Sequence, residues 1–393
     1  MRGGVLPITT EDISQELLDH GFHDFKQLRA GPFGGVVFAR DSICLGNKLV
    51  EIKIIKRGPW MKEYSDCLVK IVLQHASLMH PLLVGCYETF LTENFFCFVT
   101  ELALGGDFSS VLRTQPGGRL TESVARSYFQ QLIIALEYAH TRGVSIGNLR
   151  LANLFFDSVP SSDPSIRSPF LKLHAFGYSK AKFSLSPTIV DSDTSACNPF
   201  DEDIRAAGVI LYQLLTGVHP CTQGGRRCSF PSTLGLSEEV QDLINRMLHS
   251  KPENSSRLQD TVTNSSWFQQ DLPPGAMQLN QTWLNVAPVL DEYPVSETPA
   301  LLNELMKRAE TVGNPKDPFI YLELPYRTWL RRELALQEQV NNNNNNNNDD
   351  PGVNNTAAAK TTSTASSSHF NCVSSSVCDT EYDGMGISDD NMS

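Results

Sequence analysis

The sequence predicts an α+β protein with two lobes, a small and mostly antiparallel β lobe followed by a larger helical lobe. Strand-like apolar segments separated by glycine and proline turns fill residues 24–100. From residue 104 onward the apolar residues take helical spacing. The composition is 40% hydrophobic over 393 residues, which is enough for a large packed core with tails beside it.

The β lobe is predicted over residues 24–103, after an N-terminal extension of residues 1–23. Its strands are the segments VVFAR, LVEIKII and FFCFVTEL, which are rich in β-branched and aromatic residues. One helical patch is expected among them, at residues 66–79. A short link at residues 101–106 then leads to the second lobe, and ligands tend to bind in clefts of this interlobe kind.

The helical lobe is predicted over residues 104–275. Its first long helix has one apolar face, formed by Ala125, Phe129, Leu132, Ile133, Leu136 and Ala139. A second, almost wholly apolar helix is expected to begin at Asp203 as its N-cap and to stop at Gly217, with Pro220 beyond. A helix that is apolar on all sides is normally buried, so this one should lie in the centre of the lobe.

Two further segments follow. Residues 276–340 are predicted to form a C-terminal extension whose short amphipathic helix, residues 299–309, docks on the main body. Residues 341–393 begin with eight asparagines and continue with Ser, Thr and Ala, a composition typical of a disordered tail. The asparagine run either promotes self-association or is simply solvated.

Charge and cysteine usage exclude several classes of protein. A formal net charge of −12, a pI near 5.2 and the lack of a basic stripe argue against nucleic-acid and anionic-membrane binding. We expect neither a signal peptide nor a membrane span. Nine cysteines without a C-x-x-C pair predict reduced thiols rather than zinc or disulfides, and hence a cytoplasmic or nuclear protein.

The order of motifs resembles that of the protein kinases over roughly residues 24–275: AGPFGGVVFAR, VEIK, HP, VTELALGGDF, NLRLAN, LKLHAFGYSK and DIRAAGVILY. KRG after the lysine strand, AFGYSK, LTGVHP and WFQQDLP resemble the plant sucrose-nonfermenting-related kinases of the stress-activated second subclass. The helix near residue 300 looks like the regulatory helix of that subclass. The resemblance implies a two-lobed kinase-like fold and, in an intact member, transfer of the γ-phosphoryl group of ATP to Ser/Thr with magnesium.

The residues that would carry proton and metal chemistry are replaced. Asn148 stands where the resemblance places the catalytic aspartate, and an amide has no basic oxygen at neutral pH. Ala175 stands in place of the metal-binding aspartate and offers no ligand. Asn153 is kept, either as a vestigial magnesium ligand or as a side chain that bonds the loop backbone. We therefore expect no catalytic residue and no magnesium site.

The nucleotide cleft is altered as well. Lys53 matches the phosphate-binding lysine, while Ile71 stands where its glutamate partner would be. Glu51 replaces a small alanine and, because side chains alternate along a strand, lies on the same side as Lys53. Its carboxylate either neutralises Lys53 or turns to solvent. Phe155 is expected to fill part of the cleft.

The glycine-rich turn is only partly kept. Arg29, Gly31 and Gly34 occupy the three glycine positions, and Pro32 removes a backbone donor. The turn is either a phosphate loop or a plain hairpin. The vestigial nucleotide site thus comprises Gly31, Gly34, Val36, Lys53, Glu101 and Leu102, with Glu51 and Phe155 beside them.

Architectural positions look intact by contrast. Asp203 matches the buried aspartate that holds the catalytic-loop backbone, and Ile146 and Phe176 match the apolar column between the lobes. The segment between Gly177 and Asp203 has no A-P-E motif, which leaves Arg257 without its expected partner.

Taken together, these residues predict a catalytically impaired kinase-like protein, a pseudokinase that acts as a protein-binding scaffold or regulator. The expected partners are related kinases, phosphatases or their substrates, and ATP binding is expected to be weak at most. One alternative is an active Ser/Thr kinase with atypical catalytic residues. Another is a nucleotide sensor that binds ATP without metal.

Overall fold

The computed structural model describes most of the chain up to residue 339. The described residues are 15–31, 34–41, 47–63, 69, 72–73, 78–147, 149–160, 168–174, 198–220, 228–249, 258–286, 304–305, 307–309, 321–323, 326–327, 330, 332, 334–336 and 339. The chain divides into two units, Met1–Glu338 and Gln339–Ser393, and the elements below belong to the first. The predicted disordered tail lies outside the described residues.

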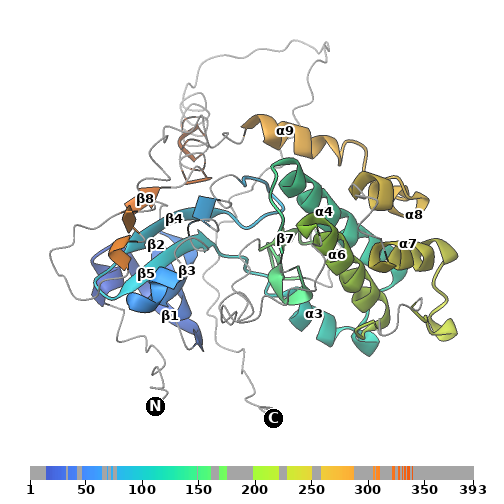
Figure 1. Ribbon diagram of the computed structural model, residues 1–393, viewed down its shortest axis with the longest axis horizontal. Helices are drawn as coiled ribbons and strands as arrows, with labels where there is room; N and C mark the ends of the chain where they lie inside the picture. The colour runs from blue at the N-terminus through green and yellow to red at the C-terminus, as the bar shows by residue number, and fades with distance from the viewer. Residues whose placement is uncertain are drawn as a thin grey trace, which may run out of the picture. The chain divides into compact units, whose positions relative to one another are not determined.

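A six-stranded antiparallel sheet forms the small lobe, in the order β1-β2-β3-β5-β4-β8 (Figure 1). Its strands are β1 (Phe22–Gly31), β2 (Gly34–Asp41), β3 (Lys48–Lys56), β4 (Cys86–Leu91), β5 (Phe95–Glu101) and β8 (Tyr321–Glu323). The predicted β lobe is confirmed. The last strand comes from the C-terminal extension, where no strand was predicted.

Alternation along β3 separates the core of this lobe from its cleft. Val50, Ile52 and Ile54 are buried in an apolar core with residues of β1, β2, β4 and β5. Glu51 and Lys53 therefore point to the opposite face of the sheet, since successive side chains of a strand alternate. This is how the β3 sequence LVEIKII places two charged groups on the face of the sheet that lies away from its apolar core.

The helical patch expected at residues 66–79 is described only in part. Val69, Val72 and Leu73 are helical, whereas Leu78 and Met79 are not. The helix therefore ends before Leu78, earlier than the pattern predicts.

Helices make up the second lobe, together with a short hairpin of β6 (Leu154–Phe156) and β7 (Leu171–Leu173). The helices are α3 (Phe108–Thr114), α4 (Glu122–Thr141), α6 (Pro199–Thr216), α7 (Glu238–His249), α8 (Ser266–Gln269) and α9 (Gln278–Val286). The six apolar residues predicted to form one face of α4 are all buried. Within the described residues, no helix combines the length and the hydropathy that a membrane-spanning segment needs.

Helix α6 is central and apolar, as predicted, but it begins earlier than expected. Pro199 is its first residue, and the Asn198 side chain accepts a hydrogen bond from the Phe200 amide. The prediction that Asp203 is the N-cap is therefore wrong; proline fits the first helical position because that amide lacks a helical partner anyway. The predicted stop is confirmed, since Gly217 adopts φ 78° and caps the helix.

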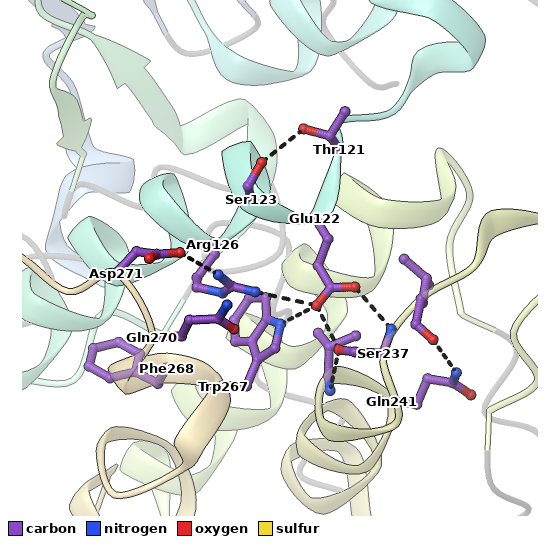
Figure 2. Close-up of polar contacts among 12 residues, drawn as sticks. Thr121, Glu122, Ser123, Arg126, Ser237, Gln241, Trp267, Phe268, Gln270 and Asp271 are labelled. Atoms are coloured by element: carbon purple, nitrogen blue, oxygen red, sulfur yellow. Dashed lines mark hydrogen bonds and ion pairs between the residues drawn. The ribbon is translucent and has the colours of Figure 1, made fainter.

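The N-terminus of α4 is held to α7 and α8 through one carboxylate. Glu122 accepts hydrogen bonds from the Trp267 indole (2.7 Å) and from the hydroxyl and amide of Ser237 (2.6 and 3.0 Å) (Figure 2). Arg126, one turn along α4, pairs with Glu122 at 3.5 Å and with Asp271 at 2.9 Å. The helical lobe is thus joined by a polar cluster as well as by its apolar core.

The C-terminal extension contacts both lobes. Asn280 of α9 is buried against α4, where its side chain donates to the Ile134 carbonyl at 3.1 Å. In the segment predicted as a short helix, the described residues 304–305 and 307–309 are helical, and Leu305 and Ala309 are fully buried. The Gly58 amide donates to the Ala309 carbonyl at 3.2 Å, which docks this helix on the small lobe.

Candidate functional site

Lys53 lies at the centre of β3, opposite Val36 of β2 and Phe98 of β5. The Glu51 carboxylate is 3.7 Å from its ammonium group, and both side chains are largely buried, at 13% and 14% exposure. Glu51 thus faces Lys53 rather than solvent, which decides between the two orientations left open above.

His174 is the second partner of Lys53. Its Nε2 lies 2.6 Å from the Lys53 ammonium nitrogen and 3.9 Å from the Glu51 carboxylate. With Lys53 in its charged form the ammonium can only donate, so Nε2 of His174 accepts and the neutral ring carries its proton on Nδ1. The position directly after β7 brings His174 here, because its own amide is held by the Asn153 carbonyl at 2.9 Å.

His174 was not among the predicted site residues. A signal was present, since this histidine directly precedes Ala175 in the motif LKLHAFG. A side chain that directly follows a strand and directly precedes the position of a replaced metal ligand is a candidate to lie beside Lys53.

Burial lowers the pKa of Lys53, and the carboxylate of Glu51 opposes that shift only in part. Two side chains of the protein offset the cost of burying this amine: the Glu51 carboxylate supplies a negative charge, and the His174 imidazole supplies a hydrogen-bond acceptor. Phe155 lies beside them, half-buried, with its ring centroid 5.9 Å from that of His174. These four side chains, Glu51, Lys53, Phe155 and His174, are called the lysine cluster below.

Glu101 connects the end of β5 to the helical lobe. Its carboxylate accepts from the Lys172 ammonium of β7 at 2.9 Å and from the Gly85 amide at 3.2 Å. Leu102 follows and is half-buried. Two residues predicted to line the nucleotide site thus sit at the interlobe link, where the Glu101 side chain ties one lobe to the other.

The remaining residues of the predicted nucleotide site lie nearby on β1 and β2. Gly31 and Gly34 face each other across the turn that joins these strands, and Val36 is half-buried. Pro32 falls outside the described residues. The pairing of β1 with β2 is therefore described as far as Gly31 and Gly34, and both alternatives for the turn itself stay predictions.

Asp203 holds the backbone of the loop that follows α4. Its carboxylate accepts hydrogen bonds from the amides of Ile146 and Gly147, both at 2.7 Å, and lies 3.0 Å from His140 Nε2. The architectural role predicted for this aspartate is confirmed. The Asp203 carboxylate therefore fixes the loop backbone at Ile146 and Gly147.

Several predicted positions lie outside the described residues. They are Asn148, Ala175, Ile71, Phe176, Arg257 and the segment that follows Gly177. Asn153 is described through its backbone: its amide donates to the Arg150 carbonyl, and its carbonyl accepts from the His174 amide.

The acidic side chains near Lys53 are engaged within the chain. Magnesium requires hard oxygen ligands in near-octahedral geometry. Both carboxylates present, Glu51 and Glu101, are paired with lysines, and the described residues contain no group of three or more side chains suited to a metal. The nearby Cys86 offers no thiolate either, because burial raises its pKa to about 12.

Comparison with known proteins gives a consistent match. Residues 22–268 match the family model described as protein kinase domain. The chain is 27% identical over 284 residues to serine/threonine-protein kinase SRK2C of Arabidopsis thaliana, covering 65% of this chain and 78% of that protein. It is 28% identical to SRK2I of Arabidopsis thaliana over 303 residues (70% and 80%) and to SRK2A of Physcomitrium patens over 287 residues (66% and 78%).

Proposed function

The chain belongs to the protein kinase family, and we propose that it is a catalytically inactive member that acts by binding other proteins. The single observation that carries this proposal is the engagement of Lys53. In an assembled kinase site the lysine must meet the nucleotide phosphates. Here its ammonium group already has a hydrogen-bond acceptor at 2.6 Å and a carboxylate at 3.7 Å within the same chain.

The sequence adds two independent losses. Asn148 cannot accept the proton of a substrate hydroxyl, and Ala175 cannot bind a metal ion. Phosphoryl transfer depends almost wholly on positioning and charge stabilisation. Each missing charged group therefore removes transition-state stabilisation that the rest of the site does not supply. Removal of one electrostatic stabiliser from an enzyme costs about 100- to 1,000-fold in rate.

A bound nucleotide has little support from this cleft. A triphosphate would have to displace His174 from Lys53 and accept the negative charge of Glu51 next to its own. We propose that ATP binds weakly at most and without magnesium, and that the partners are proteins such as related kinases, phosphatases or their substrates. The acidic chain and its reduced-type cysteine pattern favour the cytoplasm or the nucleus.

An active Ser/Thr kinase remains the competing function, on the strength of Lys53 and Asn153. We expect the purified full-length chain, with labelled ATP and either magnesium or manganese, to transfer no more phosphate than Lys53→Met. That includes transfer to itself and to a mixture of Ser/Thr peptides. The matched control is Lys56→Met, at the exposed end of the same strand.

Incorporation that Lys53→Met abolishes and Lys56→Met retains would identify an enzyme and overturn the proposal. Phosphate incorporation that both variants keep would come from a co-purifying kinase, because it does not depend on Lys53.

A further inference from the structure

The C-terminal extension adds a strand to the small lobe, beyond the end of the kinase-family match at residue 268. β8 pairs antiparallel with the outer edge of β4, in the register Glu88–Glu323, Thr89–Leu322 and Phe90–Tyr321. A three-residue strand supplies few backbone bonds. When a peptide is added to a sheet edge in this way, side-chain pockets provide the selectivity.

One such pocket receives Arg327. This arginine is 1% exposed and forms ion pairs with Asp41 at 3.3 Å and with Glu88. Both acids are themselves buried, at 2% and 3% exposure, and they belong to β2 and β4. Two carboxylates buried close together are costly unless a cation compensates them. The kinase-like body therefore carries an acidic pocket whose cation comes from the extension.

A second pocket receives Tyr326. Its ring stacks on Tyr87 of β4, with centroids 5.4 Å apart and planes at 28°. It also covers Gly85 so closely that a Cβ atom at that position would overlap the ring. Gly85 therefore leaves room for an aromatic side chain from outside the sheet.

Gly85 in turn is bonded to the interlobe link. The Glu101 amide donates to the Gly85 carbonyl at 2.8 Å, and the Gly85 amide donates to the Glu101 carboxylate at 3.2 Å. The same carboxylate accepts from Lys172 of the helical lobe. A short chain of contacts thus runs from Tyr326 through Gly85 and Glu101 to the second lobe.

We propose that the β4 edge, with Gly85, Tyr87, Glu88 and Asp41, is a docking site for a strand that carries a Tyr-Arg pair. The chain's own Tyr321–Glu323 strand and the following Tyr326 and Arg327 occupy this site, and their docking fixes the interlobe link. The inference is independent of phosphoryl transfer. It concerns the opposite face of the sheet from the lysine cluster.

The test measures backbone hydrogen exchange of the full-length chain. Arg327→Met removes the cation and keeps an aliphatic side chain of similar length. It should raise exchange about tenfold or more in β8, in β4 and in residues 101–106, while α4 and α6 stay protected. Arg332→Met is the matched control, because Arg332 is an exposed arginine of the same segment, and it should leave exchange unchanged.

Tyr326→Ala provides a variant that leaves no buried charge unpaired. It should loosen the 101–106 link through Gly85 even if Arg327→Met proves unstable. Unchanged exchange at the link in both variants would overturn the proposal. So would an increase spread evenly over both lobes, because that reports general destabilisation.

A labelled peptide of residues 318–339 tests the site itself. It should bind the Arg327→Met chain and restore protection of β4, whereas the same peptide with Arg327→Ala should not bind. The unmodified chain should not bind it at micromolar concentration, because a tethered segment competes at an effective concentration of about millimolar. Failure of the peptide to bind the Arg327→Met chain would contradict a docking site.

Discussion

Replacing Asp203 by alanine is expected to lower the free energy of unfolding by about 3 to 5 kcal/mol. The substitution leaves the amides of Ile146 and Gly147 without their acceptor and removes the partner of His140. Asp203 is only 1% exposed, so water cannot readily replace the lost oxygens. Denaturant unfolding of the full-length chain at pH 7 measures the change.

Glu202→Ala is the matched control, since Glu202 is exposed on the same turn of α6. A surface substitution of this kind should change stability by no more than about 0.5 kcal/mol. If Asp203→Ala proved as mild as Glu202→Ala, the carboxylate would not be holding the loop, and the geometry described for it would be wrong.

Replacing Glu122 by glutamine should cost about 2 to 3 kcal/mol at neutral pH, because hydrogen bonds to a charged acceptor are worth more than neutral ones. The carboxylate serves Trp267, Ser237 and Arg126 at once, and an amide cannot accept from all of them (Figure 2). Denaturant midpoints of the variant and the unmodified chain give the difference.

The same substitution should show a defined pH dependence. Burial raises the pKa of Glu122, but the hydrogen bonds from Ser237 and Trp267 and the charge of Arg126 outweigh it and lower the pKa overall. A lowered folded-state pKa stabilises the fold above the ordinary glutamate pKa of about 4.3, and this contribution disappears as the pH falls through the folded value. The cost of Glu122→Gln should therefore shrink in acid.

Glu239→Gln, at an exposed position near Ser237, supplies the comparison and should show neither the cost nor this pH dependence. A cost for Glu122→Gln that stays constant down to pH 3 would mean that packing, rather than the ionised carboxylate, accounts for it.

Much of the fold follows from periodicity in the sequence. The apolar face of α4 and the strands β3 and β5 were predictable because long, regular patterns fix which side chains are buried. The beginning of α6 was not, since both Asn198 and Asp203 are good capping residues and the choice depends on the loop that Asp203 binds. β8 is three residues long and carries no periodic signal.

The candidate site, like the fold, was predictable only in part. Alternation along β3 placed Glu51 beside Lys53 but left its orientation open. In the structure the Glu51 carboxylate faces Lys53. A second partner of Lys53 is His174, which lies 121 residues away in the sequence. Arg327 meets Asp41 across 286 residues, and no local pattern predicts a buried ion pair of that separation.

Glu51 and His174 of the same chain engage the lysine that would hold a nucleotide. Calorimetric titration of the unmodified full-length chain with ADP and ATP, with magnesium and with EDTA, tests this engagement most directly. We expect no saturable binding below about millimolar nucleotide, and at least tenfold tighter binding once Glu51→Ala and His174→Ala are combined. Micromolar, magnesium-dependent binding to the unmodified chain would contradict the account.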